Sequence, residues 1–438
     1  MVLIYSVIAV FIAWIWVDYY RLIDLFQRNK LWLFVVTFLL GCTSVLLVYF
    51  FNAIAFDYIP LELNNNFVND LLYCTIKIGV VEELAKLLPF VLVYKLFKKE
   101  FTEPVDVLVF ICTSALGFSA VENVLYFYSH GAEIINGRAI LASVGHMLDS
   151  AIVAYGYILY RYKEKRNKAY YIPLFFFLGA LMHGVYDFWL MYRPIGNLGF
   201  YFTLFSFFIG LSLFAVILNN ALNNSKYFSY AKVVNNNMVA RRLLFYYAMV
   251  FLLQFSLLTI SNGLTFAVGN LSAQLFITGI IVVVTCTRLS RFKLVKGQWA
   301  PLKLELPFEI GEGSGSRFFG LQIKGNSVDE TFMASQYQKF VILKPLSSNR
   351  AKFFNQARMA FIEEKHFLNG GQSHYLCKLY TADQNGPYQE VLLKQKVVGT
   401  TSKDGYPIVA VLVRKRNNPS KFAFAQWAVI SPMNPWEV

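Results

Sequence analysis

Nine stretches of this chain are apolar over roughly 20 residues, the length that an α-helix needs to cross the hydrocarbon core of a bilayer. They are residues 2–17, 31–56, 70–97, 104–129, 139–160, 170–192, 198–219, 243–262 and 267–287. Of all residues, 57% are hydrophobic and only 15% are charged, whereas typical soluble domains carry about 25% charged residues. The sequence therefore predicts an all-α, polytopic membrane bundle of about nine transmembrane helices.

Basic residues alternate from one connection to the next. They cluster after the first, third, fifth, seventh and ninth stretches, and the connections between these are acidic or nearly uncharged. Because basic loops stay on the cytoplasmic side, we expect the N-terminus outside and everything after residue 288 in the cytoplasm. The same bias accounts for the formal net charge of +14, so the lipid bilayer is an expected partner and nucleic acid is not.

The composition changes at about residue 297. Short extended segments such as Phe340–Leu343 and Ile408–Arg414 alternate with turns rich in Gly, Ser, Asn and Pro. This pattern is typical of strands and predicts a small β-rich (α+β) cytoplasmic domain over residues 297–438. The glycine-rich stretch 311–316 is expected to be a plain loop, and His366 and His374 surface or structural residues. The sequence indicates no partner for this domain.

Four consecutive apolar stretches contain polar side chains that a bilayer disfavours. An ionisable group at mid-membrane costs at least ~2.5–3.5 kcal/mol, so each is by default a candidate for function. The residues are Glu82, Glu83 and Lys86 in stretch 70–97, Glu122 and Asn123 in 104–129, His146, Asp149 and Ser150 in 139–160, and His183 and Asp187 in 170–192.

These residues are predicted to lie at similar depths. With a rise of about 1.5 Å per residue, Glu82 lies about 18 Å below the outer end of its helix, Glu122 and His146 about 10 Å, and His183 about 13 Å. Neighbouring helices run in opposite directions, so scattered residues would not converge in this way. We therefore expect one shared site in the outer half of the membrane.

Packing is the simpler interpretation for part of this set. Asn123, Asp149 and Ser150 are the side chains that we expect to join helices by hydrogen bonds. The adjacent carboxylates of Glu82 and Glu83 are too costly in a bilayer to serve packing alone.

Two routes of catalysis need carboxylates and imidazoles of this kind. In the first, they bind a divalent metal such as zinc, whose bound water has a pKa lowered to about 7. In the second, a desolvated glutamate activates water directly and histidines stabilise the oxyanion. Both routes hydrolyse an acyl bond. The chain has no H-E-x-x-H, and its apolar stretches lack G-x-S-G and G-x-G-D, which disfavours site-2, serine and aspartyl intramembrane proteases.

The order of the motifs is similar to that of the PrsW family of intramembrane proteases, a relative of the CAAX-protease and bacteriocin-processing superfamily. The motifs are Glu82-Glu83-x-x-Lys86, Phe118-x-x-x-Glu122-Asn123, His146 and His183-x-x-x-Asp187, and the resemblance covers residues of about 70–190. Lys86 and Glu122 stand where the wider superfamily has Arg and His. This matches the PrsW branch and disfavours a prenylated substrate.

The resemblance implies an endopeptidase of the bacterial cytoplasmic membrane that cuts single-span membrane proteins, such as an anti-sigma factor at the first step of a signalling cascade. It implies a protease core over residues 1–220, two further helices over 221–290, and the domain 297–438 beyond them. The residue roles that it implies are catalytic for Glu82, Glu83, Lys86 and His183, metal-binding (Zn²⁺ or another divalent ion) for Glu82, Glu122, His146 and His183, and supporting for Asn123, Asp149, Ser150 and Asp187.

Two rival functions use the same polar layer. In an inactive relative, acting as a binding or immunity-type membrane protein, the layer would only hold the helices together. In a proton- or cation-coupled transporter, the carboxylates would relay the ion. A transporter is expected to show repeats and broken helices, but the chain has no internal repeat, and Pro89 is the sole proline deep in the polar stretches.

Overall fold

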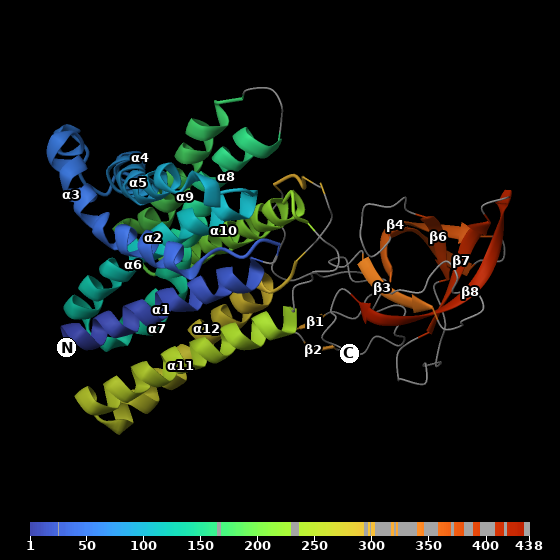
Figure 1. Ribbon diagram of the computed structural model, residues 1–438. Helices are drawn as coiled ribbons and strands as arrows, with labels where there is room; N and C mark the ends of the chain where they lie inside the picture. Colours follow the sequence, from blue (N-terminus) through green and yellow to red (C-terminus); the bar gives the residue numbers. More distant parts are fainter. Residues whose placement is uncertain are drawn as a thin grey trace. The chain divides into compact units, whose positions relative to one another are not determined.

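The computed structural model describes residues 1–24, 26–163, 168–228, 236–292, 297, 299–302 and eight strand segments between residues 317 and 432. The chain divides into two compact units (Figure 1). The first consists of Met1–Tyr227, Arg241–Leu289 and Gly297–Pro307, and the second of Phe228–Ala240, Ser290–Lys296 and Phe308–Val438. The expected boundaries near residues 220 and 290 stay predictions, although Arg241–Leu289 shares a compact unit with the motif-bearing helices.

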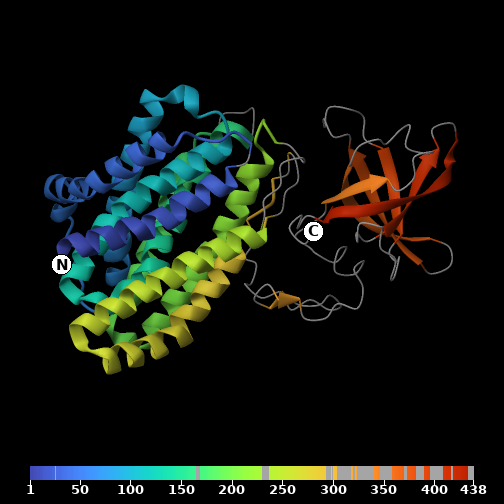
Figure 2. The same cartoon turned by 60° about the horizontal axis from the view of Figure 1, so that its bottom comes forward.

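The first unit is a bundle of long helices, seen from two directions in Figures 1 and 2. Its α-helices are α1 (Val2–Ile23), α2 (Leu31–Thr43), α3 (Val45–Ile54), α4 (Phe67–Leu72), α5 (Val81–Leu96), α6 (Pro104–His130), α7 (Ile135–Gly137), α8 (Ser143–Ile158), α9 (Tyr171–Met191), α10 (Leu198–Asn223), α11 (Asn236–Asn262, from Arg241 onward) and α12 (Leu264–Leu289). Four short segments are 3-10 helices: η1 (Phe56–Tyr58), η3 (Lys98–Glu100), η4 (Ala132–Ile134) and η7 (Arg193–Ile195). Three are π-helices: η2 (Tyr73–Val80), η5 (Arg138–Ala142) and η6 (Leu159–Lys163).

Within the described residues, eight helical segments are long and apolar enough to cross a membrane, which makes the chain a multi-pass membrane protein. The expected number was about nine. The stretch that does not qualify is 70–97, which is helical through α4, η2 and α5 but carries six charged residues. Their presence lowers the hydropathy of the segment. The side chains of Glu83 and Lys86 nevertheless lie inside the bundle, with 1% and 0% of their surface exposed.

Helix α6 lies at the centre of the bundle and packs against α1, α2, α5 and α8. Glycines allow α2 and α6 to approach closely: a Cβ on Gly41 would lie 2.3 Å from the carbonyl oxygen of Ser114, and one on Gly117 would lie 2.2 Å from that of Phe38. Small residues at such crossings are the usual way in which membrane helices gain packing contacts.

Helix α9 packs against the π-helix η2 in the same way. A Cβ on Gly79 would lie 2.2 Å from the carbonyl oxygen of Ala180, and one on Gly184 would lie 2.4 Å from the Cα of Thr75. This close approach brings His183, the residue before Gly184, next to the helix that carries the glutamate pair.

The second unit contains strands β1 (Arg317–Phe318), β2 (Leu321–Gln322), β3 (Phe340–Pro345), β4 (Arg358–Leu368), β5 (Gln372–Tyr380), β6 (Gln389–Lys394), β7 (Ile408–Lys415) and β8 (Asn418–Pro432). Strands β1 and β2 form an antiparallel pair, and β3 to β8 pair in chain order into a closed barrel. His366 and His374 are opposite each other on β4 and β5. The side chains of these two histidines and residues 311–316 lie outside the described part of the structure. The expected role of the histidines and the expected loop therefore stay predictions. A separate cytoplasmic β-rich domain stays a prediction.

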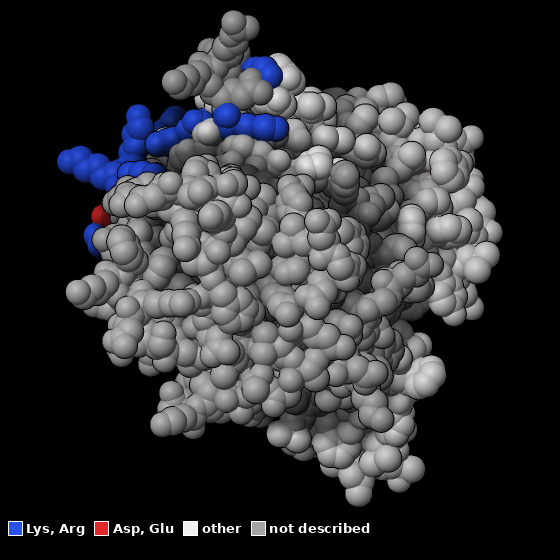
Figure 3. Space-filling view, turned by 90° about the vertical axis from the view of Figure 1, so that its right-hand side faces the viewer, with Lys and Arg blue, Asp and Glu red and all other residues white. Residues whose placement is uncertain are grey.

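Lysine and arginine side chains gather at one edge of the face shown in Figure 3, and very little acidic surface is visible beside them among the described residues. The four cysteines whose side chains are described, Cys42, Cys74, Cys112 and Cys286, are free thiols.

Candidate active site

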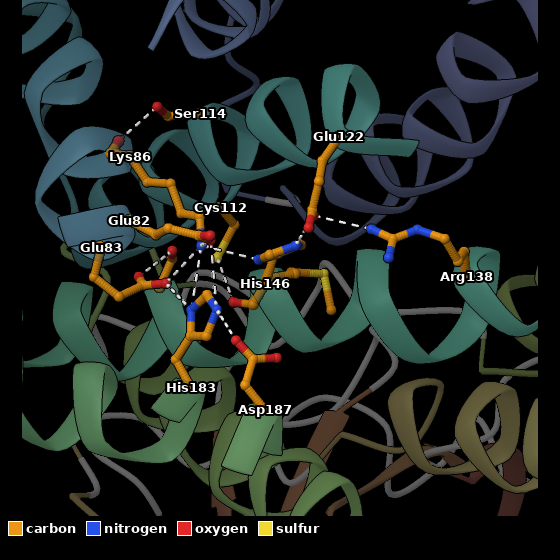
Figure 4. Close-up of polar contacts among 12 residues, drawn as sticks. Glu82, Glu83, Lys86, Cys112, Ser114, Glu122, Arg138, His146, His183 and Asp187 are labelled. Carbon is orange, nitrogen blue, oxygen red and sulfur yellow. Dashed lines mark hydrogen bonds and ion pairs between the residues drawn. The ribbon is translucent and has the colours of Figure 1, made fainter. Parts of the chain in front are cut away.

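Polar side chains from α5, α6, α8 and α9 meet in one cluster inside the bundle (Figure 4). Lys86 lies at its centre. The Nζ of Lys86 is 3.1 Å from Oε2 of Glu82 and 2.9 Å from Oε1 of Glu83. The same atom is 2.9 Å from Nδ1 of His146 and 3.3 Å from Nδ1 of His183. The side chains expected to meet from these four helices therefore do lie together.

The two glutamates of α5 have different surroundings. Glu83 is 1% exposed, and its carboxylate accepts hydrogen bonds from the Ser150 hydroxyl at 2.6 Å and from the Lys86 ammonium. Nδ1 of His183 lies 3.0 Å from the same Oε1 that binds Lys86. The side chain of Glu82 is 16% exposed. Glu83 is therefore held by donors at both oxygens, and Glu82 is less completely buried.

His183 lies between the carboxylates. Its Nε2 is 3.4 Å from Oε2 of Glu82 and 3.4 Å from Oδ2 of Asp187. These separations are longer than normal hydrogen bonds, whereas the contact of Nδ1 with Glu83 at 3.0 Å is of normal length. The ring of His183 is 5.3 Å, centre to centre, from the ring of His146. Nε2 thus faces two carboxylate oxygens without a close partner.

Glu122 contacts the far side of the His146 ring. Its Oε2 is 2.6 Å from Nε2 of His146 and 2.9 Å from Nη2 of Arg138, while Nδ1 of His146 faces Lys86. A carboxylate on the outer nitrogen of an imidazole fixes the orientation of the ring and which nitrogen faces the centre. The geometry therefore places Glu122 behind His146, and not among the groups at the centre as the sequence predicted for a metal ligand.

Arg138 lies one residue before the predicted stretch 139–160 and is not among the predicted site residues. The helix begins earlier, and the π-helix η5 (Arg138–Ala142) carries this side chain into the site. Its guanidinium also lies 3.8 Å from the centre of the Tyr126 ring. The detectable signal is spacing: Arg138 precedes His146 by eight residues, about two helical turns, which puts both on one face.

The predicted supporting residues divide into two groups. Asn123 joins helices, because its Nδ2 donates to Ser143 at 2.9 Å and its Oδ1 accepts from Nε of Arg138 at 2.7 Å. Ser150 and Asp187 instead contact the centre, through Glu83 and His183 respectively. Asp149 is buried, and it makes no hydrogen bond or ion pair with the residues that the structure describes.

Ser114 is a further contact that the sequence did not reveal. Its hydroxyl donates at 2.6 Å to the backbone carbonyl of Lys86, in the turn of α5 that precedes Pro89. Pro89 cannot donate to the carbonyl of Ala85, one residue before Lys86, and its ring disturbs this turn of the helix. The Ser114 bond ties α6 to α5 at the residue whose side chain forms the centre of the site.

A metal ion fits the donors at this centre. Glu82, His146 and His183 each offer a ligand atom, and these atoms lie within 4.8 Å of one another. Two imidazoles and one carboxylate are a donor set that zinc accepts in hydrolytic enzymes. Around the centre, four carboxylates (Glu82, Glu83, Glu122 and Asp187) lie close to one lysine and one arginine (Lys86 and Arg138), so carboxylates outnumber these two basic side chains.

Comparison with known proteins supports the same region. The model of a family described as PrsW family intramembrane metalloprotease matches residues 29–217. The matched segment contains every residue of the cluster. No solved structure matches the chain significantly.

Curated relatives named Protease PrsW align with parts of the chain. The relative from Oceanobacillus iheyensis is 30% identical over 163 residues, which are 36% of this chain and 71% of the relative. The one from Geobacillus kaustophilus is 35% identical over 106 residues, 24% of this chain and 46% of the relative. The one from Bacillus subtilis is 26% identical over 172 residues, 39% of this chain and 75% of the relative. The alignments with the relatives from G. kaustophilus and Halalkalibacterium halodurans span about half the length of those proteins.

Proposed function

Because the chain belongs to the PrsW family of intramembrane metalloproteases, we propose that it is an endopeptidase that hydrolyses peptide bonds of membrane-anchored proteins. The observation that carries this proposal is the buried group of Glu82, His146 and His183, whose ligand atoms lie within 4.8 Å of one another on α5, α8 and α9. Such a group can hold and activate a water molecule at a depth where water is otherwise scarce.

In the route without a metal, Glu82 is the proposed general base, whereas in the metal-dependent route its carboxylate is a proposed ligand. The side chain of Glu82 is 16% exposed, whereas that of Glu83 is 1% exposed and both of its oxygens accept hydrogen bonds from neighbouring donors. A general base must reach the water from which it takes a proton, within a hydrogen bond. Glu83 is then the positioning residue that holds Nδ1 of His183 and the Lys86 ammonium.

The proposed metal is Zn²⁺, held by Glu82, His146 and His183. When bound, a zinc ion lowers the pKa of its water and polarises the peptide carbonyl. The chain's own residues orient the ligands: Glu122 holds His146 through Nε2, and Arg138 holds Glu122. Arg138, Glu122 and His146 thus form a chain of contacts. In zinc enzymes, metal-binding histidines are commonly oriented by a carboxylate on their other ring nitrogen in this way.

A metal-free route uses the same residues. Glu82 takes a proton from water, and His183 donates a hydrogen bond to the oxyanion that forms on the substrate carbonyl. Chelation distinguishes the two routes, because removal of the metal abolishes cleavage only if the metal participates.

For the orientation, we propose the N-terminus outside and the C-terminal segment in the bacterial cytoplasm. The alternation of basic loops and the gathered lysine and arginine side chains in Figure 3 support this placement. The polar cluster then lies toward the outer surface. The substrate class that fits is a single-span protein cut near its outer end, such as an anti-sigma factor.

The test is cleavage in reconstituted vesicles. The substrate is a reporter made of one transmembrane helix followed by an unstructured outer segment. We expect the parent to cleave it, and Glu82→Gln, Glu83→Gln and His183→Ala to lose most of the activity. The matched control is Glu133→Gln, a carboxylate at a helix end whose side chain is exposed, which is expected to cleave normally. Equal cleavage by all four variants would reject the proposal and favour the inactive binding protein.

A further inference from the structure

The position of the Lys86 ammonium has a consequence for metal binding. Its Nζ lies within 2.9–3.3 Å of Glu82 Oε2 and of one ring nitrogen of each histidine. These three residues are also the group that could hold a metal ion. The ammonium therefore lies among the candidate ligands, on the side where a metal would be bound.

The two cations cannot share this position. A zinc ion binds imidazole nitrogen at about 2.0–2.1 Å and carboxylate oxygen at about 2.0–2.2 Å. An ammonium at 2.9 Å from Nδ1 of His146 points a proton at the lone pair that the metal would need. Metal and ammonium also repel each other at this separation, because little of the site is solvated to screen the charges.

A second carboxylate in the cluster can bind the Lys86 ammonium. Glu83 is adjacent, its Oε1 is 2.9 Å from Nζ, and it is not among the candidate metal-holding group. An ammonium that kept the Glu83 contact and moved away from Glu82 and the imidazoles would remain neutralised by a carboxylate. This provides a physical reason for two adjacent glutamates: one for the metal and one for the lysine.

We propose that Lys86 is the resident cation of the metal-free site, that a divalent metal ion displaces its ammonium from Glu82, His146 and His183, and that the ammonium is then held by Glu83 alone. The proposal rests on the proposed function, because it concerns the same site. Lys86 accordingly keeps the carboxylates compensated before metal loading and weakens metal affinity.

The test is a titration of the purified full-length protein in detergent with Co²⁺, whose visible absorption reports its ligands. Lys86→Met removes the charge and keeps most of the side-chain volume. We expect it to bind Co²⁺ about 10- to 100-fold more tightly than the parent, the size of effect that groups next to metal ligands commonly have. The matched control is Lys77→Met, because Lys77 on η2 donates to the carbonyls of Ile59 and Leu61 at 3.2 and 3.3 Å, outside the site. It is expected to bind Co²⁺ as the parent does.

A second measurement guards against poor folding. Lys86→Met leaves two carboxylates without their ammonium, so its melting temperature without metal is expected to fall below that of the parent. Co²⁺ is expected to raise the melting temperature of Lys86→Met more than that of the parent or of Lys86→Arg. A merely misfolded variant would show no such rescue.

Equal or weaker Co²⁺ binding by Lys86→Met would overturn the proposal, and so would the absence of binding in every variant. These outcomes are separate from failure of the proposed function, because binding is measured without substrate. A parent that cleaves the reporter in the presence of chelator, with no Co²⁺ bound, would retain the protease function and reject the displacement of Lys86.

Discussion

Replacing Glu122 by glutamine tests whether this residue acts through His146. Glutamine keeps the size of the side chain and one acceptor for Nε2 of His146, but it removes the charge that binds both His146 and Arg138 at 2.6 and 2.9 Å. Changes to the outer partner of a metal-binding histidine commonly cost about 10- to 100-fold in metal affinity or activity. At about 1.4 kcal/mol per tenfold, we expect a loss of roughly 1.4–2.8 kcal/mol for Glu122→Gln.

The stability of this variant is expected to change less than that of a variant which breaks a fully buried ion pair. The side chain of Glu122 is 22% exposed, and Arg138 retains the Asn123 oxygen at 2.7 Å and the Tyr126 ring. Removing one partner of a buried ion pair costs about 3–5 kcal/mol, and the partial exposure of Glu122 with the remaining contacts of Arg138 places this variant below that range.

The assay for Glu122→Gln combines Zn²⁺ affinity, measured by competition with a chelator, and kcat/KM for the reporter substrate. Both are expected to fall by similar factors and to stay measurable, whereas Glu82→Gln is expected to lose both almost completely. If Glu122→Gln were as inactive as Glu82→Gln, Glu122 would act directly at the centre, as the sequence alone predicted. An unchanged Glu122→Gln would show that its bond to His146 has no part in the reaction.

Two further predictions concern the bundle around the site. Burial raises the pKa of Glu103, just before α6, to about 7 and that of Asp24 to about 6. The native state thus binds protons more tightly than the unfolded chain. The free energy of unfolding in detergent is therefore expected to rise as pH falls from about 7 to about 5, with a Glu103 contribution of at most roughly 3 kcal/mol. A Glu103→Gln variant whose free energy of unfolding depended on pH as strongly as that of the parent would contradict this. For Gly184→Ala, whose Cβ would lie 2.4 Å from the Cα of Thr75, we expect thermal unfolding to show a loss of about 1–3 kcal/mol. Gly269→Ala, with open space around its Cβ, is the control, and equal stability of both variants would argue against the close packing of α9 on η2.

The convergence of the site was predictable because it follows from regular geometry. Helical rise converts sequence position into depth, and four polar positions on antiparallel helices had similar depths. The spacing of four residues between His183 and Asp187 likewise put both on one face, and their side chains lie 3.4 Å apart. Both arguments need only the helix repeat.

The arrangement around each imidazole was not predictable. The sequence places Glu122 in the same layer as His146 but does not say which ring nitrogen it contacts, because this depends on rotamers and on how α6 and α8 cross. Arg138 was missed for another reason. The helix already includes Arg138, the first residue of η5, one position before the apolar stretch, and an assignment by hydropathy ends at a charged residue.

The number of spans shows a related limit. The helix through α4, η2 and α5 passes the polar centre, and its charged residues lower the same hydropathy on which span assignment depends. The charged residues that the site needs are therefore the ones that hide this segment from an assignment based on hydropathy. The second unit is a different case, because its strands were expected from turn residues and β-branched runs, which carry no information on the side chains that a site would need.

Cleavage by a double variant is the measurement that most directly tests whether one shared site does the chemistry. Rates for the parent, Glu82→Gln, His183→Ala and the combination of both are compared in the same vesicles. Residues that act as a unit lose little more together than singly. We predict that the double variant retains the residual rate of the poorer single variant. Losses that multiply would mean that Glu82 and His183 act independently, which would contradict a common catalytic centre.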